Sequence, residues 1–149
     1  MLNVLIVSDS NFSKNVIASV YLGDFGENYF IIECAEIDPG PLNPMVTMMM
    51  KLDGYDISKY DNQHSVAELI KKGRCYDIVI TVCSKRIDEK CPDFPGQRLR
   101  LNWSHPEPDK IAESRIDRIQ QIKVMIDNIK VDVLNLINKY EEGELCVKP

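Results

Sequence analysis

The sequence predicts an α/β domain with a four-stranded parallel sheet and helices on both faces. Two observations lead to this prediction. Short apolar runs of strand length alternate with segments of helical spacing, the order that βαβ units produce. The last part of the chain carries one long apolar stripe with a 3.6-residue period, which indicates a helix packed on the sheet. A length of 149 residues suits one domain, and we expect a frayed tail after Gly143.

The first half of the chain begins with a strand. Leu2–Val7 is an uninterrupted apolar run, as expected of a strand buried on both faces. Apolar residues then recur at helical spacing between positions 16 and 21, where Ser13 or Asn11 would cap the helix and Gly23 would end it. Tyr29–Cys34 predicts the second strand.

The remaining elements follow a loop rich in proline. Pro44 suits the first turn of a helix that continues to Leu52 and ends at Gly54. The next predicted helix is Val66–Lys72, closed by a glycine. Asp77–Cys83 is rich in β-branched residues and predicts a central strand. The last strand and the long helix are placed at Leu99–Trp103 and Ala112–Tyr140.

Composition and charge argue against several classes of function. A net charge of −5 argues against general binding to nucleic acid or to an anionic membrane, and no apolar run reaches the roughly 20 residues of a membrane helix. The start of the chain lacks the features of a signal peptide, and the number of cysteines is odd, so we expect a cytoplasmic protein with reduced thiols. The spacing of cysteines and histidines predicts no metal site, and we expect no cofactor. The five cysteines are Cys34, Cys75, Cys83, Cys91 and Cys146.

A polar segment connects the first strand to the first helix. Ligands of parallel sheets bind at the carboxyl ends of strands, and the N–H groups of such a turn and helix start attract anions. Lys14 would add a positive charge, whereas the carboxylate of Asp9 would repel an oxyanion. On spacing alone, a plain turn with a capping serine is the favoured interpretation. The candidate anion-binding residues are Asp9, Ser10, Asn11, Phe12, Ser13, Lys14 and Asn15.

This segment resembles the phosphate-binding loop of the low-molecular-weight tyrosine phosphatase superfamily. That loop reads cysteine, five residues, arginine, and then serine or threonine. In this sequence Ser8 stands at the position of the nucleophilic cysteine, Lys14 at that of the arginine and Asn15 at that of the following residue. Asn11 matches the asparagine that shapes the loop. The resemblance implies the family fold with a degenerate active site.

Other segments resemble the branch of thioredoxin-coupled arsenate reductases. They are Pro41–Pro44, Gly54–Ser58, Asp77–Cys83 and Cys91–Gly96. The resemblance implies that Cys83 and Cys91 hold the positions of the disulfide relay, and that Glu107 replaces the aspartate that acts as general acid. The simpler interpretation of Cys83 and Cys91 is a strand-end and a loop cysteine without a redox role, and of Glu107 a solvated carboxylate.

The substitutions remove the chemistry of that family. A serine hydroxyl has no ionised fraction comparable to that of a thiolate, and it needs an adjacent base. Arsenate reduction needs a sulfur, and lysine lacks the bidentate grip of arginine. The sequence thus predicts a pseudo-enzyme that holds phosphate, sulfate, arsenate or a phosphorylated ligand around Ser8 and Lys14. Two alternatives stay open: a thiol redox protein that uses Cys83 and Cys91 with thioredoxin as reductant, and an active phosphatase or arsenate reductase with a replacement nucleophile.

Overall fold

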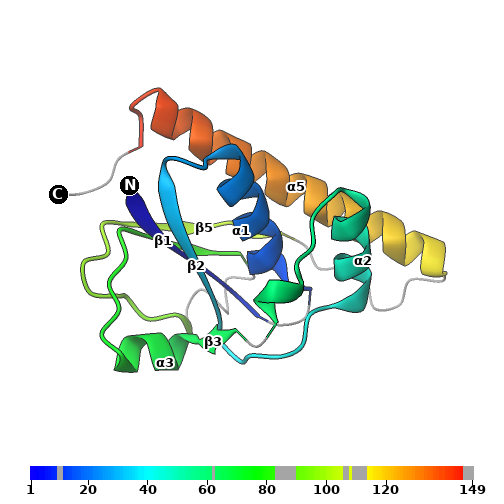
Figure 1. The fold of residues 1–149 in the computed structure, drawn as a ribbon, viewed down its shortest axis with the longest axis horizontal. Helices are drawn as coiled ribbons and strands as arrows, with labels where there is room; N and C mark the ends of the chain where they lie inside the picture. Colours follow the sequence, from blue (N-terminus) through cyan, green and yellow to red (C-terminus); the bar gives the residue numbers. More distant parts are fainter. Residues whose placement is uncertain (10–11, 62, 83–89, 106–107, 109–113, 146–149) are drawn as a thin grey trace.

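The computed structural model describes residues 1–9, 12–61, 63–82, 90–105, 108 and 114–145 (Figure 1). Helices α1, α2 and α5 cover one face of a twisted sheet, and α3 packs on the other face. The predicted α/β class, with a parallel sheet between helices, is therefore confirmed. Among the described residues, no helix combines the length and the apolar character needed to cross a bilayer.

Within the described residues the sheet has five strands, not the four that the sequence predicts, and all pairs are parallel. The extra strand is β3, His64–Ser65, which pairs with the end of β2 at the sheet edge. Two polar residues give no hydrophobic alternation, so the pattern could not reveal this strand. The order is β3-β2-β1-β4-β5, with β1 Leu2–Ser8, β2 Phe30–Glu36, β4 Ile78–Thr81 and β5 Leu99–Asn102.

The helices largely lie where apolar spacing predicts them. They are α1 Lys14–Phe25, α2 Pro44–Leu52, α3 Val66–Lys71 and α5 Arg115–Glu141, with a 3-10 turn at Ser58–Tyr60. The predicted stop at Gly23 is wrong, because α1 passes through it and ends where the Gly26 N–H donates to the Leu22 carbonyl. A helix tolerates an interior glycine at a cost of about 1 kcal/mol, so this residue alone did not define the end.

Strand β1 lies at the centre of the packing. Val4 and Ile6 face the helices α1 and α5, whereas Leu5 and Val7 face the cluster under α3, and all four are fully buried. Burial on both faces explains the uninterrupted apolar run. The strand thereby carries its last residue, Ser8, to the carboxyl edge of the sheet between β2 and β4.

Candidate anion-binding site

Ser8 ends β1 with a fully buried side chain. Its hydroxyl donates a hydrogen bond to the Asp9 carbonyl oxygen at 2.8 Å and accepts one from the Asn15 N–H at 3.3 Å. The Asn15 N–H belongs to the first turn of α1, where donors have no partner within the helix. Ser8 therefore joins the end of β1 to the start of α1, and its proton points to a backbone carbonyl.

The turn before α1 has an unusual backbone at Ser13. With φ of 51° and ψ of 37°, it is the only non-glycine residue with positive φ in the described part of the chain. The Ser13 hydroxyl does not cap α1; it accepts a hydrogen bond from the Asn43 N–H at 3.1 Å. This contact ties the loop after β1 to the start of α2, so the turn is held from two sides.

Lys14, the first residue of α1, is completely buried. Lysine is almost never fully buried unless its charge is paired. Its position at the N-terminal end of a helix places a cation where the helix dipole is also positive. The buried cation of Lys14 and the N-terminus of α1 thus lie together at the carboxyl edge of β1.

Asn15 acts as a cross-link. Its Nδ2 donates to the Ala35 carbonyl at 2.8 Å and to Gln63 Oε1 at 2.7 Å, while its Oδ1 accepts from the Val16 N–H at 2.9 Å. These bonds join α1 to the end of β2 and to the segment before β3. The side chain of Asn15 is thus occupied by structural contacts, and its contribution to the site is the position of its backbone.

Glu36 is a site residue that the sequence analysis missed. It ends β2 directly opposite Ser8 in the parallel register, so both side chains project from the same face of the sheet. It is only 3% exposed, and its Oε2 has no hydrogen-bond partner within the described residues. Burial raises the pKa of the Glu36 carboxyl to about 7; the Gly40 N–H counteracts the shift, and the charge of Asp9 adds to it. The available signal was the alternation Phe30, Ile32, Cys34, Glu36 along one strand face.

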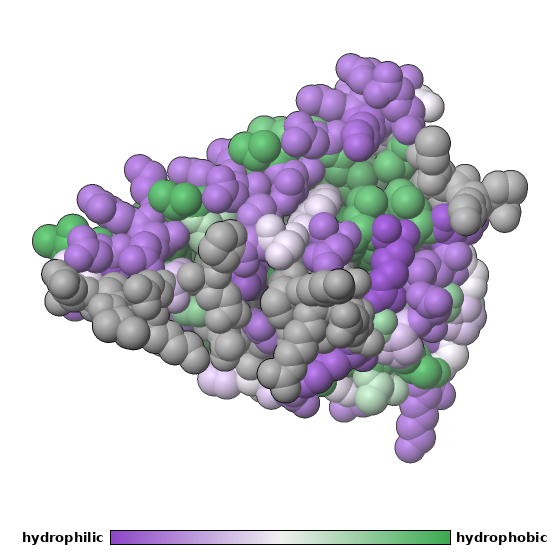
Figure 2. Space-filling view, turned by 180° about the vertical axis from the view of Figure 1, so that it is seen from behind, coloured by the Kyte–Doolittle hydropathy of each residue, from purple (hydrophilic) through white to green (hydrophobic). Residues whose placement is uncertain are grey.

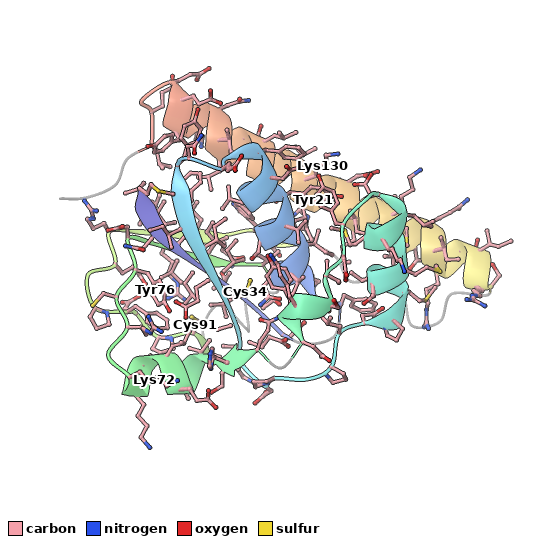
Figure 3. The ribbon with its side chains drawn as sticks, viewed as in Figure 1. Tyr21, Cys34, Lys72, Tyr76, Cys91 and Lys130 are labelled. Atoms are coloured by element: carbon pink, nitrogen blue, oxygen red, sulfur yellow. The ribbon has the colours of Figure 1, made fainter. Side chains whose placement is uncertain are left out.

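Two of the cysteines that the structure describes, Cys34 and Cys91, lie on opposite faces of the sheet. Cys34 lies on β2 beside α1, with its Sγ 2.6 Å from the Ser19 hydroxyl, and burial raises its pKa to about 12. Cys91 is 4% exposed and belongs to the cluster on the other face, near Tyr76 (Figure 3). Phe12, also predicted for the site, is half-buried and packs against the core cluster that includes α1 and α5. The other predicted site residues lie outside the described residues: Ser10, Asn11, Cys83 and Glu107.

A concave region lies under the C-terminal half of α5, where hydrophobic side chains gather (Figure 2). It has a volume of about 360 Å³, and its apolar residues include Leu99, Leu101, Trp103, Leu136 and Leu145. Its polar residues are Asp132, Asn135, Lys139 and Glu144, so two carboxylates face one lysine in a mostly apolar lining, which does not suit a small oxyanion. In the described part of the chain, no three histidine, cysteine or acidic side chains are grouped to hold a metal ion.

Comparison with known proteins identifies the fold. No family model matches the sequence, and the search of curated proteins found no match. Among solved structures, a thioredoxin-dependent arsenate reductase from Corynebacterium glutamicum matches with a TM-score of 0.71 and 22% identity over 96% of this chain and 63% of that chain. An arsenate reductase in the phosphate binding state matches with a TM-score of 0.68 and 20% identity over 93% of this chain and 98% of that chain. A protein tyrosine phosphatase from Entamoeba histolytica matches with a TM-score of 0.68 and 17% identity over 97% of this chain and 99% of that chain.

Proposed function

We propose that this chain, whose fold is that of the arsenate reductases and low-molecular-weight tyrosine phosphatases, binds a small oxyanion or a phosphorylated ligand and has lost the reaction. The ligand site is the loop from Asp9 to Asn15, at the carboxyl end of β1. The ligands considered are phosphate, sulfate, arsenate and a phosphate group on a larger molecule.

The hydrogen bonding of Ser8 carries the proposal. An oxygen nucleophile needs a base that accepts its proton. The Ser8 hydroxyl instead donates to the Asp9 backbone carbonyl, a group that cannot take a proton, and makes no hydrogen bond to the carboxylate of Glu36. In this arrangement the hydroxyl remains neutral, and it contains no sulfur with which to reduce arsenate.

Two features support binding without turnover. The twelve-residue helix α1 directs its N-terminus at the loop, and Lys14 adds a buried cation beside it. One matched arsenate reductase is described as being in a phosphate binding state, so the same fold holds this class of anion elsewhere.

Calorimetric titration with phosphate tests the binding, and assays with p-nitrophenyl phosphate and with arsenate plus thioredoxin test the loss of reaction. We expect saturable binding and no turnover. Lys14→Met should weaken phosphate binding at least about tenfold, since it removes the buried cation. Lys72→Met is the matched control, because Lys72 is exposed and points away from the molecule (Figure 3). Turnover that disappears in Ser8→Ala would contradict the proposal.

A second candidate function is thiol exchange through Cys83 and Cys91, with thioredoxin as the partner. The observation in its favour is that the matched Corynebacterium protein is described as thioredoxin-dependent. Reactive cysteines are partly exposed, and Cys91 at 4% exposure would have to become accessible. Mild oxidation followed by peptide mass spectrometry tests this candidate. A Cys83–Cys91 bridge that thioredoxin reduces would support it, and failure to form the bridge would contradict it.

A further inference from the structure

Glu36 is a buried carboxyl group beside the loop between β1 and α1, and the proposed function gives it no role. It faces the same side of the sheet as Ser8, and the Ile37 N–H donates to the Ser8 carbonyl at 3.1 Å, which fixes the two strand ends together. One of its oxygens is buried without a partner in the described residues. A buried acceptor without a donor costs about 1–3 kcal/mol, so its presence points to a donor other than the residues that the structure describes.

A carboxylate beside an anion site repels the anion unless a proton lies between them. That proton has two sources: the carboxyl group can be protonated and donate to the anion, or the anion can carry a proton and donate to the carboxylate. Sulfate is fully ionised near neutral pH and has no proton to donate. Hydrogen phosphate and hydrogen arsenate each retain one. The unpartnered Glu36 oxygen would therefore distinguish between these two kinds of oxyanion.

We propose that Glu36 makes oxyanion binding at the β1–α1 loop depend on one shared proton, so that the site prefers hydrogen phosphate or hydrogen arsenate over sulfate. The proposal rests on the proposed function and specifies its ligand class. The bound proton lies between Glu36 Oε2 and an oxygen of the ligand, and no covalent bond changes.

The neighbouring charges favour this behaviour. Asp9, on the loop after β1, adds to the burial that holds the pKa of Glu36 near 7. The other charged groups on adjacent elements are Lys14 at the start of α1, Asp38 on the loop after β2, and His64 on β3. The Nδ1 atom of His64 lies 3.2 Å from the Oε2 atom of Glu68. Burial is the largest cause of the raised Glu36 pKa, and Asp9 is the one of these groups whose charge adds to it.

Calorimetric titration of the full chain with sulfate and with phosphate at constant ionic strength tests the proposal, at about pH 6 and about pH 8.5, on either side of the Glu36 pKa of about 7. Sulfate affinity should fall about tenfold or more between these pH values, because each pH unit above the pKa removes the protonated form tenfold. Phosphate should lose less, because it brings its own proton. Near neutral pH, sulfate binding should take up protons from the buffer.

Glu36→Gln should bind sulfate equally at both pH values and should lose the preference for phosphate, because an amide donates at any pH. Glu27→Gln removes the same charge from an exposed residue and should keep the behaviour of the unmodified chain. If the unmodified chain binds neither anion at either pH, the oxyanion site itself is wrong. If it binds sulfate without pH dependence and without proton uptake, the site stands and the role of Glu36 is wrong. Proton uptake by the unmodified chain decides the question even if Glu36→Gln does not fold.

Discussion

At the scale of single residues, serine side chains hold the loop after β1 in place through hydrogen bonds to backbone groups. The Ser8 hydroxyl donates to the Asp9 carbonyl and accepts from the Asn15 N–H, and the Ser13 hydroxyl accepts from the Asn43 N–H. A cysteine at position 8 would be larger and a weaker hydrogen-bonding partner. The serine is therefore a structural part of this turn, and its loss should be felt in the stability of the fold.

Ser8→Ala should lower the free energy of unfolding by about 1–3 kcal/mol, because two backbone groups near a buried position lose their partner. Ser104→Ala, at an exposed position, is the control and should change stability by less than about 0.5 kcal/mol. Urea unfolding followed by circular dichroism measures both. Equal stability of Ser8→Ala and the unmodified chain would show that the hydrogen bonds of Ser8 contribute nothing net.

The thiols should differ strongly in reactivity. Burial raises the pKa of Cys34 to about 12, and Cys91 is buried, whereas Cys75 is exposed. Because the thiolate is the nucleophile, iodoacetamide at neutral pH should modify Cys75 before Cys34 and Cys91, which should stay unmodified until the chain unfolds. Peptide mass spectrometry over time measures the order. Early modification of Cys34 in the folded protein would contradict its burial.

At the scale of elements, the spacing of apolar residues predicted most helices and strands, but not the short strand β3 or the end of α1. Burial on both faces leaves a plain signal in β1, and Pro44 marks the start of α2 correctly. The strand β3 gives no such signal, because its two polar residues are held by pairing with β2. Glu36 was missed for a related reason: its importance depends on the register that places it opposite Ser8, and register is a property of two strands together.

The start of α2 offers a test of how local capping supports the loop region. The Asn43 side chain accepts from the N–H groups of Met45 and Val46 at 3.0 and 3.1 Å. Asn43→Ala should cost about 1 kcal/mol of stability through loss of this cap. Phosphate binding should persist, because the contact from Asn43 to Ser13 uses the backbone N–H.

The control is Asn128→Ala at an exposed position within α5, where alanine favours the helix and stability should not fall. Thermal unfolding compares the two variants. If Asn43→Ala is as stable as the unmodified chain, the cap does not stabilise α2. If it abolishes phosphate binding while remaining folded, the start of α2 contributes to the site through more than the backbone of residue 43.

At the scale of the whole molecule, two carboxyl groups give stability opposite dependences on pH. The side chain of Arg98 and the Asn3 N–H hold the pKa of Asp77 below its usual range, so this group stabilises the fold at neutral pH and loses its contribution in acid. The carboxyl of Glu36 behaves in the opposite way, because its pKa is raised from 4.5 to about 7 by burial. The folded chain then holds this proton more tightly than the unfolded chain does.

Stability should therefore fall as the pH rises from about 4.5 to about 7, because the unfolded chain releases the Glu36 proton first. The shift from 4.5 to about 7 corresponds to a loss of about 3 kcal/mol. Below this range the protonation of Asp77 lowers stability again, so the maximum should lie on the acidic side of neutrality. Urea midpoints measured across this range in the absence of oxyanions should show the decline in the unmodified chain and in Glu27→Gln, which changes an exposed carboxyl group. Glu36→Gln, which cannot ionise, should lose most of the decline and be the more stable protein at neutral pH. A variant that keeps the full slope would mean that Glu36 ionises in the folded chain as readily as in the unfolded one.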